Sequence, residues 1–230
     1  MNAENLIQEA LSNNRQALSE FGSKQLLAAC GLPVTREQLA GSREEAARFA
    51  EAIGFPVAAK ACSPELMHKS EANLIELGLT DTTRVMAAFD RLAEKAGSDI
   101  EGILIQEMIA GRRELVLGLI RDPQFGPCVM LGLGGIFTEV FQDTVFRMAP
   151  VDRVEAMDMI GELRSRAMLD TFRGQAAADT DALCQAIIAV GQIGMNFEAV
   201  SEIDINPLII TPTGDITAVD ALVVLNGGVL

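Results

Sequence analysis

Residues 201–222 read SEIDINPLIITPTGDITAVDAL and contain two apolar, β-branched runs around the turn signal Pro212-Thr213-Gly214. Proline suits the second position of a type I turn, and glycine tolerates the left-handed residue that follows such a turn. The stretch therefore predicts an antiparallel hairpin with a three-residue loop and a bulge. In this register Thr211 faces Asp215, and counting from that pair fixes every other pair along the two strands.

Four oxygen-bearing side chains share one face of this expected hairpin. Counting back from the turn puts Asn206 directly opposite Asp220, where cross-strand Cβ atoms are about 5 Å apart. Because side chains alternate along a strand, Glu202 and Asp204 lie on the same face as Asn206. Converging oxygens suit a hard cation such as Mg²⁺, with phosphates and water completing its shell. The alternative, favoured on geometry alone, is an edge hairpin whose acidic face only meets solvent.

The composition is that of a globular protein with an excess of acidic residues. The 230 residues are 49% hydrophobic and 22% charged, which allows one domain or two lobes with a sizeable core. The net charge of −14 argues against a nucleic-acid partner, because phosphate contacts require a basic surface. No apolar run reaches the length of a membrane span, and the N-terminus lacks the pattern of a signal peptide. We therefore expect a cytoplasmic protein with no membrane partner.

The periodicity predicts two lobes after an N-terminal helical extension over residues 1–18, which has little to bury. Residues 19–108 combine helices at 19–30, 42–54 and 81–96 with apolar strands at 55–61, 74–79 and 102–108, which is typical of an α/β lobe. Residues 109–230 combine strands at 114–120 and 127–131 and helices at 152–169 and 179–195 with the closing hairpin. This second lobe should be mainly antiparallel sheet, so we expect an α/β or α+β protein.

A short basic segment is unusual in this acidic chain. Only four lysines are present, and Lys60 and Lys69 bracket the segment that also holds the only histidine, His68. Lys60 ends an apolar strand, where its ammonium group either reaches an anion or extends along the strand end to solvent. His68 lies beside Lys69, which disfavours the charged imidazole and leaves a neutral nitrogen able to accept a group. An ordinary surface or core histidine is the alternative.

Together these motifs resemble the ATP-grasp subunit of ADP-forming acyl-CoA synthetases, in the succinyl-CoA synthetase superfamily. The resemblance covers about residues 18–225, with the motifs in the same order. One departure is Ala72-Asn73, where the family usually has a glycine pair after the histidine segment. The matching segments are Ser63–Glu71, Arg121–Gly126, Leu131–Glu139, Phe146–Pro150, Phe172–Gly174, Glu202–Leu208 and Ala218–Ala221.

The resemblance implies an ATP-grasp fold, in which two lobes hold the nucleotide between them. It implies that Lys60 contacts the α- and β-phosphates and that backbone groups of Met108 and Ile109 read the adenine edge. Glu107 and Glu114 match acidic positions that accept hydrogen bonds from ribose hydroxyls.

Further residues are implied for the phosphates and the metal. Gly134 and Gly135 lie in a Gly-rich turn whose backbone N–H groups approach phosphate. Arg147 is a phosphate or interface contact, with a structural salt bridge as the alternative. His68 receives the phosphoryl group on or near its ring, and Lys69 offsets the added charge. The implied Mg²⁺ ligands are Asn206, Asp220 and Asp204.

The implied activity is that of the beta-type subunit of an acid–thiol ligase that uses ATP or ADP and Mg²⁺. The reaction is acid + CoA + ATP ⇌ acyl-CoA + ADP + phosphate, through a phosphohistidine relay. The family's CoA-binding domains are expected on a partner alpha-type subunit in a heterotetramer. Two alternatives remain: a nucleotide-sensing module that regulates a partner enzyme, and a self-sufficient carboxylate ligase that forms an acyl phosphate.

Overall fold

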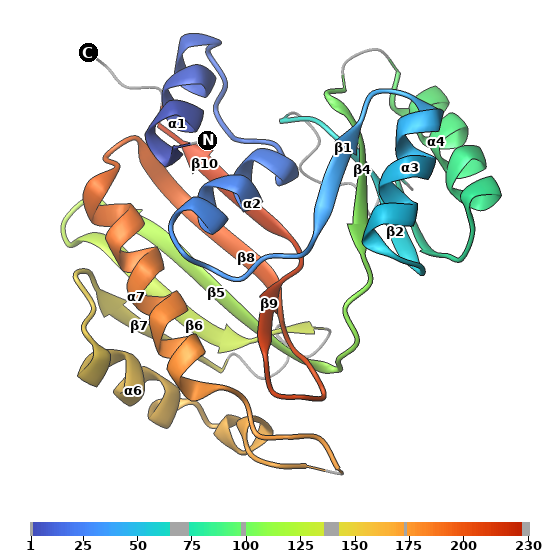
Figure 1. The fold of residues 1–230 in the computed structure, drawn as a ribbon. Helices are drawn as coiled ribbons and strands as arrows, with labels where there is room; N and C mark the ends of the chain where they lie inside the picture. Colours follow the sequence, from blue (N-terminus) through green and yellow to red (C-terminus); the bar gives the residue numbers. More distant parts are fainter. Residues whose placement is uncertain (1, 65–73, 98–99, 136–142, 173, 227–230) are drawn as a thin grey trace. The chain divides into compact units, whose positions relative to one another are not determined.

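The computed structural model describes residues 2–64, 74–97, 100–135, 143–172 and 174–226, which form two compact units (Figure 1). The smaller unit comprises the described residues of Ser19–Phe21 and Thr35–Met108. The larger unit comprises those of Met1–Leu18, Gly22–Val34 and Ile109–Leu230. Within the described ranges, no helix has the length and apolar character needed to cross a bilayer.

The smaller unit is a four-stranded antiparallel sheet with two helices packed on it. The strand order is β1-β4-β2-β3, and apolar residues of α3 and α4 form one core with the sheet. The strands are β1 (Glu37–Ala40), β2 (Val57–Cys62), β3 (Ile75–Leu79) and β4 (Gly102–Glu107), and the helices are α3 (Arg43–Ile53) and α4 (Thr82–Ala96). Strand β1 was not predicted, because its four residues carry no alternating apolar pattern.

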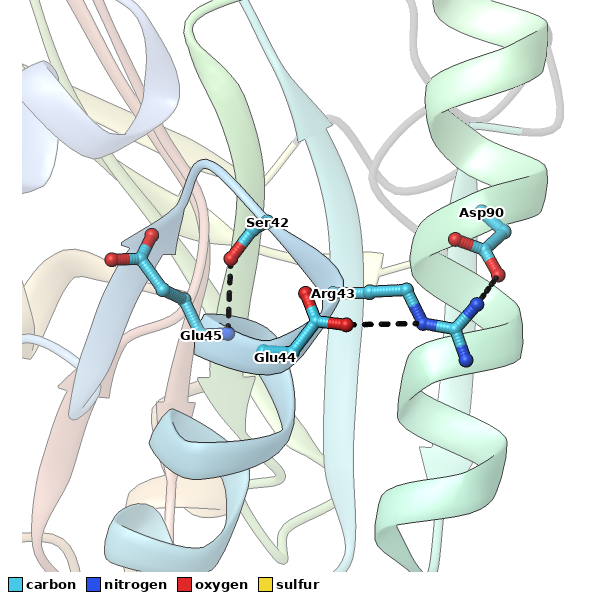
Figure 2. A network of polar contacts seen from close by, with 5 residues as sticks. All are labelled: Ser42, Arg43, Glu44, Glu45 and Asp90. Carbon is cyan, nitrogen blue, oxygen red and sulfur yellow. Dashed lines mark hydrogen bonds and ion pairs between the residues drawn. The ribbon is translucent and has the colours of Figure 1, made fainter.

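Side-chain caps fix the start of α3, as Figure 2 shows. Ser42 accepts a hydrogen bond from the backbone N–H of Glu45 at 3.2 Å, which satisfies one of the free donors of the first turn. The Glu45 carboxylate accepts from the backbone of Gly41 at 3.0 Å, so the cap is displaced by one residue from a reciprocal capping box. Arg43 then ties this turn to α4 through Asp90 at 2.9 Å.

The larger unit is built on a six-stranded antiparallel sheet with order β10-β8-β5-β6-β7, to which β9 adds beside β8. Helices α6 and α7 lie on one face of this sheet, and α7 buries residues along most of its length (Figure 1). The strands are β5 (Arg113–Asp122), β6 (Gly126–Leu133), β7 (Thr144–Met148), β8 (Val200–Ile210), β9 (Ile216–Ala218) and β10 (Ala221–Leu225); the helices are α6 (Arg153–Glu162), the 3-10 helix η2 (Arg166–Leu169) and α7 (Thr180–Asn196).

The closing hairpin has the predicted register. The backbone N–H of Thr211 donates to Asp215 at 2.8 Å, and Ile210 pairs with Ile216. Gly214 adopts φ +98, the left-handed conformation that the three-residue loop requires. The register continues without a shift to Asn206, whose N–H donates to the Asp220 carbonyl at 3.2 Å. The pairing of these two residues is therefore confirmed.

The N-terminal segment differs from its expected place in the fold. Helix α1 (Ala3–Ser12) buries Ala3, Ile7 and Ala10 in the core of the larger unit, so residues 1–18 are part of that unit. Residues 22–34, which include most of helix α2 (Glu20–Ala29), also belong there, whereas the sequence predicts them in the first lobe.

Helix α2 holds the hairpin on both sides of Asp220. The fully buried Lys24 ammonium group donates to the Val219 carbonyl at 3.1 Å. The Ser23 hydroxyl accepts from the backbone N–H of Val223 at 3.1 Å. These contacts span about two hundred residues of sequence, which is why local patterns did not predict them.

Arg113 anchors a corner of the larger unit. It is only 5% exposed, and its guanidinium donates to the carbonyls of Met168, Asp170, Ala176 and Thr211 at 2.7–3.3 Å. The segment after α6 and the hairpin turn are thereby fixed to the start of β5. Only its Nε atom has no hydrogen-bond partner in the part of the chain that the structure describes.

We expect Arg113→Met to destabilise the larger unit by on the order of 3 kcal/mol, because several buried carbonyls lose a charged donor. The free energy of unfolding is measured by urea denaturation followed by circular dichroism. The control is Arg153→Met, which removes an exposed ion pair with Asp181 and should change the free energy of unfolding far less, because solvent screens such pairs. Equal losses in the two variants would contradict the anchoring role.

Candidate functional site

The acidic face of the hairpin forms as the sequence predicts. Ile203 and Ile205 are buried against the helix-covered core, whereas Glu202, Asp204 and Asn206 point to the opposite face. Asp204 is on β8, which is flanked by two strands, and it pairs with Gly118 of β5 on one side and with Leu222 of β10 on the other. Carboxylate and amide oxygens from neighbouring strands therefore share one surface.

The Asp204 carboxylate lies close to other negative charges on this face. Burial raises the pKa of Asp204 above its ordinary value, and the negative charges of Glu202 and Asp220 raise it further. A divalent cation would relieve this repulsion, and oxygen ligands are those that Mg²⁺ prefers, so the residues present fit the implied metal. Among the described residues, no three His, Cys, Asp or Glu side chains by themselves form a metal-binding group. A Mg²⁺ ion here would therefore need phosphate or water oxygens as well.

A cavity of about 1110 Å³ adjoins this face in the larger unit. Its volume is slightly above the range of about 300–1,000 Å³ that is usual for small-molecule sites. Asn206 of the hairpin lines it together with three residues expected at the nucleotide, Glu114, Gly134 and Gly135. The other lining residues are Arg112, Leu133, Asp143, Arg164, Ser165 and Met168.

The glycine pair is required by close backbone packing. The N–H of Gly134 donates to the Glu114 carbonyl at 2.8 Å, and a Cβ at Gly134 would lie 2.9 Å from backbone atoms of Glu114 and Leu115. Gly135 adopts φ +75, and a Cβ there would lie 2.9 Å from the Glu114 carboxylate. Any larger side chain at either position would therefore displace β5 or the Glu114 carboxylate from the cavity wall.

Asp143 is a site residue that the sequence did not reveal. Its buried carboxylate accepts from the backbone N–H groups of Arg164 at 2.9 Å and Ser165 at 2.7 Å. Burial alone would raise the pKa of Asp143, but the hydrogen bonds from Ser165 and Arg164 and the charge of Arg164 together lower it. Asp143 thus stays ionised and fixes the segment between α6 and η2. Its contacts lie twenty-one and twenty-two residues away, and no local motif marks them.

Lys60 does not lie free at the end of its strand. It is buried on β2, and its Nζ atom is 2.6 Å from the carboxylate of Glu20, which is also buried in the smaller unit. The sequence predicted the cation but not this partner, which lies forty residues away. The pair as a whole carries no net charge, so any contact of Lys60 with phosphate has to compete with Glu20.

Two other expected nucleotide contacts already have partners. Both carboxylate oxygens of Glu107 accept from Arg36, one from its backbone N–H at 2.7 Å and one from its guanidinium. Arg147 forms an ion pair with Glu162, which raises the pKa of Arg147 and ties β7 to α6. This geometry favours the structural salt bridge, which is the alternative to a phosphate or interface contact for Arg147.

The remaining expected residues are placed as follows. Met108 is exposed at the end of the smaller unit, and Ile109 is half-buried at the start of the next segment of the larger one. His68 and Lys69 lie outside the described residues.

Comparison with known proteins gives consistent matches. Residues 9–225 match the family model of an ATP-grasp domain. The chain is 36% identical over 229 residues to the beta subunit of ADP-forming acetate–CoA ligase II of Pyrococcus furiosus, covering 96% of this chain and 97% of that one. It is 35% identical over 217 residues to the ADP-forming 4-hydroxybutyrate–CoA ligase of Nitrosopumilus maritimus, covering 92% of this chain and 31% of that one.

A solved structure is also closely similar. It is the dinucleotide-forming acetyl-coenzyme A synthetase 1 of Candidatus Korarchaeum cryptofilum, in complex with coenzyme A and Mg-AMPPCP, with its phosphohistidine segment pointing towards the nucleotide-binding site. The TM-score is 0.87 at 39% identity, over 98% of this chain and 100% of that chain.

We expect Asp204→Asn to raise the melting temperature at pH 7 in buffer with EDTA, because it removes a carboxylate that the fold disfavours. Since the native pKa of Asp204 is raised, the fold favours the protonated carboxyl group over the ionised one. The stability contributed by protonation is fully present below the unfolded pKa of about 3.9 and is lost as the pH rises through the native pKa. The gain should therefore shrink as the pH falls towards 4. An effect on the order of 1 kcal/mol corresponds to about 2–4 °C for a chain of this length.

The control for this measurement is Glu198→Gln, which makes the same charge change at an exposed position just before β8. Its melting temperature should change little at any of these pH values. An Asp204→Asn variant that melts at or below the wild-type temperature at pH 7 would contradict the repulsion on this face.

Proposed function

This chain belongs to the ATP-grasp domain family, and we propose that it is the nucleotide-binding subunit of an ADP-forming acyl-CoA synthetase. The reaction is acid + CoA + ATP ⇌ acyl-CoA + ADP + phosphate. The observation that carries the proposal is the cavity in which Asn206 of the acidic hairpin meets Glu114, Gly134 and Gly135. Near full-length similarity to a beta subunit of such a ligase supports the same reaction.

The proposed metal site is the hairpin face. Asp220 and Asn206 would hold Mg²⁺, with Asp204 as a third oxygen donor. When bound, the ion supplies positive charge that offsets the phosphates and stabilises charge on the transferring phosphoryl group. The chain's own part is to hold these oxygens in place, and the continuous hairpin register around Thr211–Asp215 does so.

In the larger unit, Gly134 and Gly135 have no side chain to block the approach of phosphate to the backbone, but the N–H of Gly134 already donates to the Glu114 carbonyl and could bind phosphate only by leaving it. The Glu114 carboxylate accepts from a hydroxyl of the ribose. Met108 and Ile109 offer backbone groups to adenine.

Two contacts of the smaller unit require an exchange of partners. Lys60 can bind phosphate if it leaves Glu20, and Glu107 can accept from ribose if it releases an oxygen from Arg36. We no longer assign Arg147 to phosphate, because Glu162 neutralises it. The ion pairs of Lys60 and Glu107 would hold these side chains in place until nucleotide binds.

We assign CoA binding to a partner alpha-type subunit in a cytoplasmic heterotetramer. The relative from Pyrococcus furiosus is itself named a beta subunit, and the Korarchaeum structure contains a phosphohistidine segment that points towards the nucleotide. In our proposal that segment belongs to the partner, and His68 carries the phosphoryl group between it and ADP, with Lys69 offsetting its charge. Relatives that act on acetate and on 4-hydroxybutyrate suggest that the partner also selects the acid.

The purified chain alone should form no acyl-CoA from Mg-ATP, CoA and either acetate or 4-hydroxybutyrate. Co-expressed with a CoA-binding subunit encoded in the same genome, it should form acyl-CoA and ADP with one of these acids or a related one. The measurement is product formation followed by liquid chromatography. Acyl-CoA formation by the chain alone would contradict the proposal, and nucleotide binding without turnover in the complex would favour a sensing module.

The same complex, supplied instead with acyl-CoA, phosphate and Mg-ADP so that ATP is the product, tests His68 through His68→Asn. A carrier role predicts near-complete loss of transfer to ADP, while the partner's histidine still becomes phosphorylated. A loss of only roughly 10-fold, the size of one hydrogen bond to a charged group, would mean that His68 merely contacts the phosphate.

A further inference from the structure

Most arginines of this acidic chain already have partners within it. Seven form ion pairs with Asp or Glu, and Arg113 and Arg121 donate to backbone carbonyls. In the described part of the chain, three guanidinium groups have neither an ion pair nor a hydrogen bond: Arg112, Arg164 and Arg166. The paired arginines are Arg36, Arg43, Arg48, Arg84, Arg91, Arg147 and Arg153.

Two of the three unpaired arginines line the same cavity. Arg112 and Arg164 are exposed residues of the cavity wall, and among the described side chains neither forms an ion pair with the two carboxylates that also line it, Glu114 and Asp143. Arg166 is exposed as well but is not among the lining residues. In a chain with 32 Asp and Glu against 18 Lys and Arg, two guanidinium groups left facing a cavity indicate a site for an anion from outside the chain.

Both arginines are held by buried charged neighbours. Arg112 directly precedes Arg113, whose guanidinium is fixed by four carbonyls. The backbone N–H of Arg164 donates to the buried Asp143 carboxylate at 2.9 Å, and the same carboxylate holds Ser165. The charge of Arg164 acts on Asp143, but the two side chains form no ion pair within the described ranges. The backbone of each arginine is thus fixed while its guanidinium stays available.

We propose that Arg112 and Arg164 bind the terminal phosphoryl group of the nucleotide, which is the γ-phosphoryl group of ATP. This inference rests on the proposed nucleotide-binding function. Guanidinium groups bind phosphate through paired hydrogen bonds, and charge on a transferring phosphoryl group is what such a site has to stabilise. We expect the terminal group next to the metal, and Asn206, a proposed Mg²⁺ ligand, lines this cavity. Lys60, the candidate for the inner phosphates, belongs instead to the smaller unit.

The test compares two nucleotides that differ in the terminal group. Calorimetric titrations with Mg-ADP and with Mg-AMPPCP, the β,γ-methylene analogue of ATP, are run on wild type, on Arg112→Ala/Arg164→Ala and on Arg166→Ala. The double variant should bind Mg-AMPPCP about 10- to 100-fold more weakly, as expected for lost hydrogen bonds to a charged group. Its affinity for Mg-ADP should change less than about threefold, because ADP lacks the γ-phosphoryl group that the pair binds. Arg166→Ala should bind both nucleotides as wild type does.

The outcomes separate this inference from the function on which it rests. Equal weakening for both nucleotides, or none for Mg-AMPPCP, would overturn the assignment to the terminal group while leaving nucleotide binding intact. A comparable loss in Arg166→Ala would overturn the role of the cavity, because it would show a general effect of charge. Wild type that binds neither nucleotide would overturn both proposals. All the substituted residues are exposed, so unchanged melting temperatures should accompany each comparison.

Discussion

The unfavourable environment of the Asp204 carboxylate, which is partly buried beside Glu202 and Asp220, is the constraint on which the proposed chemistry of this fold depends. The strands hold these carboxylates on one face, and the pKa of Asp204 is raised because burial and its two acidic neighbours disfavour its charge. Such an arrangement costs stability in the absence of a cation. In the proposed function, Mg²⁺ and phosphate bound together at this face would offset that cost.

The rest of the larger unit keeps that face in place. Gly118 lies opposite Asp204, and a Cβ there would come within 2.7 Å of the Ile203 carbonyl, so glycine permits the close approach of β5 and β8. Lys24 and Ser23 of α2 hold the chain on either side of Asp220, and Arg113 fixes the hairpin turn. These contacts make the acidic face a property of the whole unit rather than of the hairpin alone.

The sequence predicted the features that local rules decide. Pro212-Thr213-Gly214 determines the turn, and the turn determines the register, so the pairing of Asn206 with Asp220 could be counted from the chain alone. Helix α3 begins where Ser42 can cap it. The resemblance to a known family supplied the ATP-grasp fold, which the comparisons support.

The features that the sequence did not predict depend on distant contacts. Glu20 reaches Lys60, Glu107 binds Arg36, and Asp143 holds Arg164, all across separations that no periodic pattern encodes. Helix α1 looked too polar to pack, yet three small or apolar residues on one side are enough to join it to the core. Short strands such as β1 also gain their stability from pairing, since their own residues carry no distinct pattern.

The most direct test of the acidic face is calorimetric titration of ADP into wild type and Asp220→Ala, each with Mg²⁺ and with EDTA. Wild type should bind ADP more tightly when Mg²⁺ is present, because the ion joins the hairpin carboxylates to the phosphates. Asp220→Ala should lose that Mg²⁺-dependent gain while keeping a folded-state circular dichroism spectrum. An unchanged Mg²⁺-dependent gain in Asp220→Ala would contradict the role of the hairpin as the metal site.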